Sequence, residues 1–353
     1  MPELILNHIK DMKGQPIILN DLEVQFAEQT QREFNAKFPH INNSLGFELP
    51  ITTLTGIFKK VSEQKFATIA PADYLPLRVG ENSWSTSILT YRSYSIAGSF
   101  ETGNLNVGAN NSKLATSDTG VDGVTVKVMN WGVENSWNVM ELMTAARSGN
   151  WDLVTSKEHA RKKMWDLGIQ KTAFLGLADN SDFLGLFTQP NVNSNTTAIT
   201  TYIKDMTATQ FQTMIGTLLG AYQTNCNYTA YPTHFIMPAV DFNGCANAVD
   251  ENFGLRSRLE RMEESFKRIT MNPNFKILPN FYADNANNTD TIDLNRYTLL
   301  NYDETSLRMD IPVDYTSTLQ NTINGFNFNN VGYGQYTGAK AYRPLEVLYF
   351  DWS

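Results

Sequence analysis

Two strand-favouring segments flank a polar stretch that is punctuated by glycines in the first half of the chain. The first, Ser85 to Ala97, is rich in Thr, Tyr and Ile, which favour strands. In the second, Val124 to Trp131, apolar and polar positions alternate, as in a half-buried strand. Together they predict a long two-stranded hairpin over Ser85–Trp131. Because an isolated hairpin is marginally stable in water, we expect another surface, such as a second copy of the chain, to cover it.

Helical periodicity predicts a short helix at Val139–Arg147 and a long one from Asp152 to Leu175. Two more helices are expected at Thr207–Tyr222, with apolar residues at i, i+3, i+4 and i+7, and at Leu255–Ile269, which is dense in charge. The apolar face predicted for the long helix comprises Leu153, Ala160, Met164, Leu167 and Phe174, with Trp165, Ile169 and Ala173 beside it. Asp205 or Thr207 is the expected cap of the third helix.

Strands are predicted mainly in the C-terminal half of the chain, without a regular strand–helix–strand alternation. Their expected ranges are 233–238, 297–302, 307–311, 327–336 and 345–350. Mixed helices and strands without that alternation predict the α+β class. Residues 1–55 have no dense apolar pattern apart from a weak helical stripe over Asp21–Phe38, which indicates an arm that docks on other surfaces.

Charge is sparse and slightly acidic overall. Charged residues make up 18% of the 353 positions, below the usual share of about 25%, and Asn, Thr and Ser replace them in loops. Such a surface suits broad protein–protein contact, although general Asn-rich usage explains it equally well. The net charge of −8 argues against a dedicated nucleic-acid-binding protein. One basic cluster on the long helix is either a solvated face or a weak, sequence-independent phosphate contact. It comprises Lys157, Arg161, Lys162 and Lys163.

No pattern typical of catalysis, metal binding or cofactor binding emerges from the sequence. Cys226 and Cys245 form no CxxC pair, so free buried thiols are expected. The four histidines lack metal-ligand spacing, and His234 reads as a core or interface residue. The glycine-rich run Gly332–Gly338 leads into another strand rather than a helix, which argues against a phosphate loop. We therefore expect no enzyme, no cofactor and no metal, and neither a signal peptide nor a membrane span.

Several local sequences follow one another in an informative order. They are Thr90-Tyr91-Arg92 in the first hairpin strand, Val139–Gly149 before the long helix, Thr172–Gly176 and Leu184–Asn191 after it, and Gly338–Asp351, which contains Tyr342-Arg343-Pro344 and an apolar strand. This order resembles the shell proteins of tailed bacteriophages with the Hong Kong 97-type capsid fold, which encapsulins share. The similarity covers Leu54 to Ser353.

The resemblance implies four structural parts. They are an N-terminal arm (1–55), an extended E-loop (84–135), a peripheral domain (56–83, 136–203 and 302–340) with its spine helix at 152–175, and an axial domain (204–301 and 341–353). The E-loop would lie over a neighbouring copy of the chain, and the axial domain would meet its copies at five- and six-fold centres. The E-loop residues that contact a neighbouring copy would include Tyr91, Arg92, Lys113, Val126 and Trp131.

The resemblance also implies a function and partners. The chain would be a major capsid protein that assembles as hexamers and pentamers into an icosahedral shell around double-stranded DNA, forming part of the virion after assembly in the bacterial cytoplasm. A separate scaffold protein (or a segment removed before Met1), a portal and decoration proteins would be further partners. The type member of the family joins its subunits covalently through a hairpin lysine and a nearby asparagine. Lys113 is the only lysine at the hairpin tip here and no asparagine can be assigned as its partner, so we expect no covalent cross-linking. The alternatives are an encapsulin-like compartment with enzyme cargo, and a carbohydrate-binding module or hydrolase.

Overall fold

The computed structural model describes residues 4–10, 16–19, 65–96, 117–147, 153–249, 256–322 and 324–352. The chain divides into two units, residues 1–65 and 66–353. In the first unit, β1 (Leu4–Lys10) pairs antiparallel with β2 (Pro16–Leu19). The helix predicted over Asp21–Phe38 lies outside the described residues.

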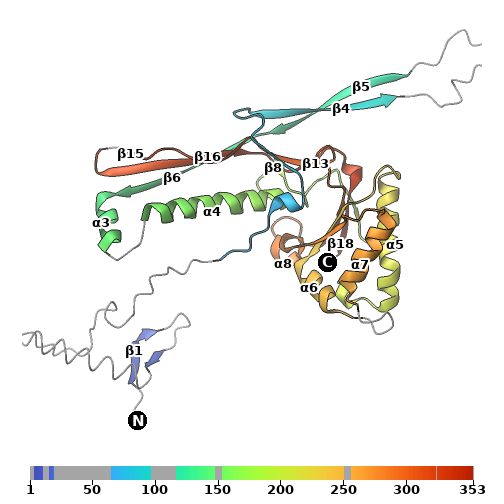
Figure 1. The fold of residues 1–353 in the computed structure, drawn as a ribbon, viewed down its shortest axis with the longest axis horizontal. Coiled ribbons are helices and arrows are strands. Elements are labelled where there is room, and N and C mark those ends of the chain that lie inside the picture. Colours follow the sequence, from blue (N-terminus) through green and yellow to red (C-terminus); the bar gives the residue numbers. More distant parts are fainter. Residues whose placement is uncertain are drawn as a thin grey trace, which may run out of the picture. The chain divides into compact units, whose positions relative to one another are not determined.

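The second unit contains a mixed five-stranded sheet, which lies in the compact part near the C-terminus (Figure 1). Its strands, in spatial order, are β11 (Lys276–Asn280), β10 (His234–Pro238), β12 (Asn295–Leu300), β18 (Val347–Trp352) and β9 (Asn193–Asn195). Successive side chains of a strand point to opposite faces. Phe235 and Met237 accordingly join one hydrophobic core, whereas Ile236 joins another. The same sheet therefore forms a wall of both cores.

Three helices, α5 (Ala208–Asn225), α6 (Ala239–Asn247) and α7 (Arg258–Thr270), surround the first of these cores. Helix α5 begins at a capping box, in which the Thr207 side chain accepts from the Gln210 N–H and the Gln210 side chain accepts from the Thr207 N–H. Its buried residues Phe211, Met214, Ile215, Leu218, Leu219 and Tyr222 are those of the predicted stripe. The predictions of this helix and its cap are confirmed.

The second core also contains residues of the long helix α4 (Leu153–Phe174), which packs against an antiparallel sheet. That sheet contains β14 (Val313–Ser317), β16 (Asn327–Tyr336), β15 (Asn321–Thr322) and β6 (Met129–Asn138), which pairs with β16 over its whole length. Helix α3 (Val139–Arg147) follows β6 directly. Figure 1 shows α4 running alongside β6 and β16.

Glycines in β16 explain how closely α4 approaches this sheet. A Cβ atom at Gly332 would lie 2.5 Å from Nε of Arg161, and one at Gly334 would lie 2.5 Å from the Trp165 ring. Real Cβ atoms do not make such contacts, so these positions exclude larger residues. The glycine-rich run thus serves helix packing.

The buried face of α4 differs from the predicted one. Trp165, Ile169 and Ala173 are buried as core residues, whereas Met164, expected on the apolar face, is 57% exposed. The stripe is rotated because Arg161 occupies one of its buried positions, and hydropathy assigns an arginine to the outside. The predicted helix is confirmed. Its predicted face is confirmed at Leu153 and Phe174, which are buried, and wrong at Ala160 and Met164, which are exposed.

Short elements complete the second unit. They are β3 (Leu77–Val79), β13 (Leu307–Ile311) and β17 (Lys340–Ala341) in a three-stranded sheet, the β7–β8 pair (Gly176–Leu177 and Asn180–Leu184), and α8 (Asn285–Asn288). The free cysteines Cys226 and Cys245 are buried, as predicted. None of the described helices is long and apolar enough to cross a membrane. The α+β class is confirmed.

Candidate functional site

The long hairpin is formed by β4 (Ser87–Ile96) and β5 (Asp118–Lys127). Their register is continuous from the Ser87–Lys127 pair to the Ile96–Asp118 pair. The hairpin prediction is confirmed, but its second strand ends earlier than expected. After Val128 the chain enters β6, which pairs with β16 instead of β4. Lys113 lies outside the described residues.

The root of the hairpin is buried, and polar contacts join it to the body. Ile88 and Val126, which face each other across the two strands, are 4% and 6% exposed. The Val128 N–H donates to the Thr86 carbonyl oxygen at 3.0 Å. Lys127 forms an ion pair with Asp182 of β8 at 2.6 Å. The residues at the root of the hairpin are therefore fixed to the rest of the unit.

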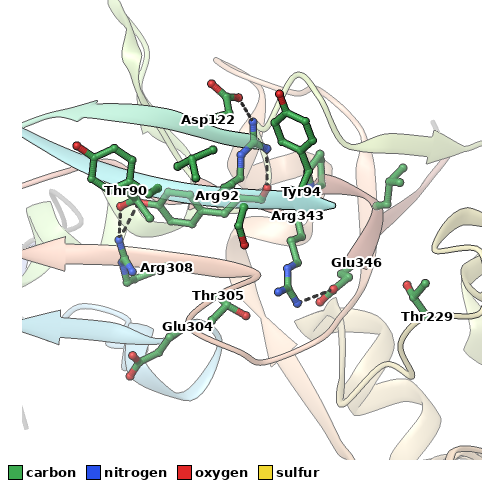
Figure 2. A pocket seen from close by; sticks show the side chains of 16 residues that line it. Thr90, Arg92, Tyr94, Asp122, Thr229, Glu304, Thr305, Arg308, Arg343 and Glu346 are labelled. Atoms are coloured by element: carbon green, nitrogen blue, oxygen red, sulfur yellow. Dashed lines mark hydrogen bonds and ion pairs between the residues drawn. The ribbon is translucent and has the colours of Figure 1, made fainter. Parts of the chain in front are cut away.

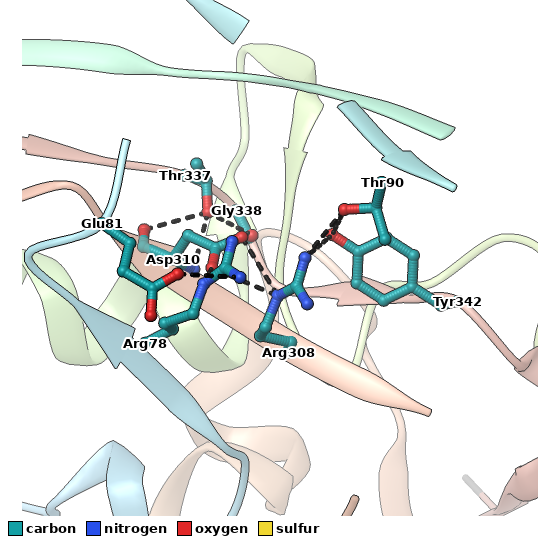
Figure 3. A network of polar contacts seen from close by, with 8 residues as sticks. All are labelled: Arg78, Glu81, Thr90, Arg308, Asp310, Thr337, Gly338 and Tyr342. Carbon is teal, nitrogen blue, oxygen red and sulfur yellow. Dashed lines mark hydrogen bonds and ion pairs between the residues drawn. The ribbon is translucent and has the colours of Figure 1, made fainter. Parts of the chain in front are cut away.

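A buried guanidinium, that of Arg308 in β13, bridges the hairpin to the body (Figure 3). Its Nη2 donates to the Thr90 hydroxyl at 2.8 Å and to the Tyr342 hydroxyl at 3.1 Å. Its Nε lies 3.1 Å from the carboxylate of Asp310, which also pairs with Arg78 at 2.8 Å. Arg308 and Asp310 are 8% and 2% exposed. Buried charges that are paired and hydrogen-bonded hold their partners firmly, so this network fixes Thr90.

A second, more exposed contact lies further along the hairpin. Nη1 of Arg92 donates to the Tyr342 carbonyl oxygen at 3.1 Å, and Nη2 pairs with Asp122 of β5 at 3.0 Å. These residues line a groove of about 920 Å³ between the hairpin and the segment around Tyr342–Glu346, shown in Figure 2. Beyond Arg92, this groove separates the hairpin from the body of the subunit.

The opposite face of the hairpin is apolar and exposed. Leu89, Tyr91 and Val121 are 49%, 69% and 66% exposed. Tyr91 pairs with Gly123, above which the Leu89 and Tyr91 side chains lie. These three residues form the hairpin stripe. Exposed apolar side chains gathered in one place are typical of interaction surfaces.

The predicted E-loop residues therefore occupy different environments. Tyr91 and Arg92 lie on opposite faces of the ribbon, while Val126 is buried at its root. Trp131 is not in the hairpin: it lies in β6, and its ring centroid is 5.2 Å from that of Trp165 in α4. Its placement in the E-loop is wrong, because the strand that contains it pairs with β16 and faces the core.

The predicted basic cluster on α4 is also divided. Arg161 is 2% exposed; its Nε donates to the Tyr315 hydroxyl at 2.9 Å, and its Nη1 donates to the Asn330 carbonyl oxygen at 2.8 Å. Nη2 forms an ion pair with Glu158, which also accepts from Tyr315. Arg161 is thus a structural tie between α4, β14 and β16. Its assignment to a genome-facing patch is wrong.

The three lysines of the cluster lie nearer the surface. Lys157 donates to the Ser136 carbonyl oxygen at 2.6 Å and lies 3.3 Å from Glu141. The Lys163 ammonium lies 4.6 Å from the Phe66 ring centroid. Lys162 is exposed, and its charge opposes the burial that raises the pKa of Asp166. Lys162 is the cluster residue best placed to meet another molecule.

His234 is nearly buried, as expected for a core or interface residue. It is 6% exposed, and its ring lies 4.9 Å from that of Tyr302 in a stacked arrangement. Burial and the nearby Lys276 lower the pKa of His234 to about 4, against a smaller opposing effect of Asp73. The imidazole is therefore neutral near pH 7.

Sequence reasoning missed the residues that fix the hairpin to the body. Arg308 and Asp310 alternate with apolar residues in Leu307–Ile311, a strand that is buried throughout. Charged residues at i and i+2 in such a strand are a signal of a buried pair, because unpaired charges are not tolerated there. The Tyr342-Arg343-Pro344 sequence contributed only to the resemblance. In the structure, its Tyr342 contacts Thr90, Arg92 and Arg308.

A comparison with models of known protein families identifies the family of this chain. Residues 105–352, more than half of the chain, match the model of the major capsid protein. The chain belongs to the major capsid protein family. This family is one of structural proteins that build an icosahedral shell, and the resemblance read from the sequence is confirmed.

Solved structures give the same fold for this major capsid protein. The capsid of Myoviridae phage XM1 matches with a TM-score of 0.70 at 17% identity, over 87% of this chain and 100% of that one. The capsid of cyanophage P-SCSP1u matches with a TM-score of 0.52 at 12% identity, over 88% and 94%. A Mycobacterium phage Bobi structure matches with a TM-score of 0.52 at 11% identity, over 83% and 93%. No curated protein matches the chain. The Hong Kong 97-type fold is thereby shown.

Proposed function

We propose that this capsid protein assembles with its own copies, as hexamers and pentamers, into the head of a tailed phage that encloses double-stranded DNA. The observation that carries the proposal is the family match together with a hairpin whose exposed apolar stripe has no partner within the described part of the chain. Closed symmetry repeats each contact many times, so individually weak interfaces suffice.

The division into parts that we propose follows the two cores. Most residues of the core around α5, α6 and α7 fall in the axial domain (204–301 and 341–353), and most residues of the core around α4 fall in the peripheral domain (56–83, 136–203 and 302–340). Residues 1–55 form the arm. The E-loop, expected at 84–135, has its paired strands at 87–96 and 118–127. Residues 129–138 pair with β16, which supports placing them with the peripheral domain.

The E-loop acts as a strap between subunits in this proposal. Ordering such a ribbon costs conformational entropy, which contacts with a neighbour offset on assembly. Amide protons of β4 and β5 beyond Arg92 should exchange quickly in isolated subunits and slowly in particles. Equal protection in both states would contradict the strap.

Contact with the packaged DNA is weak and independent of sequence in this proposal, and Lys162 and Lys163 supply it. The net charge of −8 limits any such affinity. Replacing both lysines by glutamate should leave shell assembly intact but lower the DNA content of filled heads. Unchanged DNA content would remove the spine helix from the genome contact. A separate scaffold, a portal and decoration proteins are the remaining proposed partners.

Electron microscopy of the protein, produced alone and with the neighbouring phage structural proteins, tests the proposed assembly. Closed shells with six- and five-fold clusters, filled with DNA, are expected. Shells that enclose enzymes instead would favour a compartment of the encapsulin type, and persistent monomers would contradict both. We propose that no covalent cross-link joins the subunits. Denaturing gels of mature particles should therefore show single chains, and a ladder of multimers would contradict this.

A further inference from the structure

The turn between β15 and β16 contains an asparagine that is followed by a glycine, Asn324-Gly325. Both residues are exposed, and the turn lies beside the start of α3, where the Val139 N–H donates to the Phe326 carbonyl oxygen at 3.1 Å (Figure 1). Asparagine amides are thermally labile. The backbone nitrogen after an asparagine can attack the side-chain amide when no Cβ stands in the way, and glycine has none. The turn therefore places an electrophile and a nucleophile in adjacent residues.

Two backbone N–H groups hold the side-chain oxygen of Asn324. The Phe326 N–H donates to Asn324 Oδ1 at 3.2 Å, and the Asn327 N–H donates to the same oxygen at 2.8 Å. Attack at Cγ places negative charge on Oδ1, and donors already aimed at that oxygen stabilise the charge as an oxyanion hole does. Within the described part of the chain, no hydrogen bond holds the amide nitrogen Nδ2. The amide is thus oriented through its oxygen, and its nitrogen is free to leave.

The attacking nitrogen, that of Gly325, has a proton acceptor beside it. Its N–H donates to the Thr322 hydroxyl oxygen at 2.8 Å. The Thr322 hydroxyl itself donates to the Asn327 carbonyl oxygen at 3.3 Å, so that a lone pair of its oxygen faces the Gly325 N–H. An acceptor in this place polarises the N–H bond and makes the nitrogen more nucleophilic. A Cβ at Gly325 would meet no atom within 4 Å, so the surrounding space is open.

The other Asn-Gly pair of the sequence, Asn243-Gly244, lacks this arrangement. It lies inside α6, and ring closure there would require the helical backbone to open and lose hydrogen bonds. A Cβ at Gly244 would overlap the Lys204 side chain, so the backbone has little room to move. The Asn243 side chain is exposed like that of Asn324, so accessibility to water does not distinguish the two pairs. Backbone conformation and hydrogen bonding do.

We infer that Asn324 is a site of self-catalysed deamidation. The Gly325 nitrogen forms a bond to Cγ of Asn324, the Cγ–Nδ2 bond breaks, and ammonia leaves with the proton of the Gly325 N–H. Water then breaks a C–N bond of the succinimide ring, returns a proton to the nitrogen and leaves aspartate or isoaspartate. Each event replaces a neutral amide with a carboxylate and adds one negative charge to the exposed turn. The charge accumulates with the age of the chain, whatever the chain assembles into.

Two variants identify the groups that promote the reaction. Thr322→Val keeps the shape of the side chain but removes the proton acceptor, and it should slow the conversion of Asn324 about tenfold, less than a dedicated general base contributes. Thr318→Val is the matched control, because the Thr318 hydroxyl likewise accepts a backbone N–H, that of Val331, at 2.9 Å in the same sheet. It should leave the rate unchanged. An unchanged rate in Thr322→Val, or an equal fall in both variants, would overturn the assisted mechanism.

Peptide mass spectrometry of the wild-type chain, stored warm and sampled over time, tests the inference without any variant. The change in mass from amide to acid should appear at Asn324 while Asn243 stays unmodified. The same chain unfolded in guanidinium chloride is the reference, because neither pair has a fixed conformation there. Asn324 should convert about tenfold faster in the folded chain than in the unfolded one, because the reacting groups are oriented. Conversion at an equal or lower rate in the folded chain would overturn the inference, and neither result depends on the shell function.

Discussion

Arg92 of the hairpin donates a hydrogen bond to the carbonyl oxygen of Tyr342, 3.1 Å away, although the two residues are 250 positions apart in the chain. The donor is 44% exposed, as is typical of a contact that forms and breaks easily. Arg308, one contact closer to the root, is buried. Along β4, the hairpin is therefore held by a buried attachment at Arg308 and a more exposed one at Arg92.

Arg92→Ala should loosen the ribbon while the rest of the chain stays folded. Because ion pairs at exposed positions contribute less than about 1 kcal/mol, the free energy of unfolding should change little. Hydrogen exchange of the β4 and β5 amides near residues 90–93 and 120–124 should become faster in isolated subunits, because the outer attachment is gone. Ser93→Ala, on the other face of the same strand, is the control. Identical exchange in both variants would show that Arg92 does not hold the ribbon.

Arg308→Met should destabilise the isolated subunit by about 3 kcal/mol, since it leaves the buried Asp310 with one cation and removes the donor to Thr90. Arg343→Ala provides the comparison. Its side chain is 55% exposed and pairs with Glu346 at 3.2 Å, so less than about 1 kcal/mol should be lost. Urea unfolding of both variants measures the difference. Equal losses would contradict the assignment of Arg308 as the buried bridge.

Substitution of two adjacent basic residues of α4 should change the free energy of unfolding by very different amounts. Arg161→Met should cost about 3 kcal/mol, because the carbonyl of Asn330 and the carboxylate of Glu158 lose the hydrogen bonds that the buried guanidinium donates. Lys162→Met should change the free energy of unfolding by no more than about 0.5 kcal/mol, as expected of an exposed position. Thermal unfolding distinguishes them. Similar midpoints for the two variants would mean that Arg161 is not a structural tie.

His234 should make the stability of the folded chain sensitive to mild acid. The unfolded chain binds a proton with a pKa of about 6.5, whereas the folded pKa is lowered to about 4 by burial and by Lys276. The unfolded state therefore binds more protons between these values, and stability is lost as the pH falls from about 6.5 to about 4. His234→Phe, which keeps a ring against Tyr302, should flatten this part of the profile in urea unfolding. Parallel profiles for variant and wild type would refute the role of His234.

Local patterns predicted most of the regular elements of this capsid protein. The strands 307–311 and 327–336 and the helix 139–147 have the predicted bounds, because their periodicity is strong and their ends carry clear signals. The continuous strand predicted from Val124 to Trp131 is divided at Val128, since which strand pairs with which depends on residues some 200 positions away. No local pattern contains that information.

Buried polar groups were the main source of error. Arg161 has the hydropathy of a surface residue, and its burial rotated the apolar face of α4 away from Met164. Asp241 of α6, which is 0% exposed, accepts hydrogen bonds from the N–H groups of Ile203 and Lys204 and from the Tyr297 hydroxyl. Its partners come from two distant segments, so only the folded structure shows that its carboxyl oxygens are hydrogen-bonded.

The five-stranded sheet has a mechanical consequence for a shell. Because its two faces belong to two different cores, neither core can tilt against the other without disturbing strand register. The body of each copy, without its hairpin, should then move as one rigid unit. In the proposed shell, we expect differences in curvature between five-fold and six-fold positions to be accommodated where the hairpin meets the body, at the few hydrogen bonds around Thr90 and Arg92.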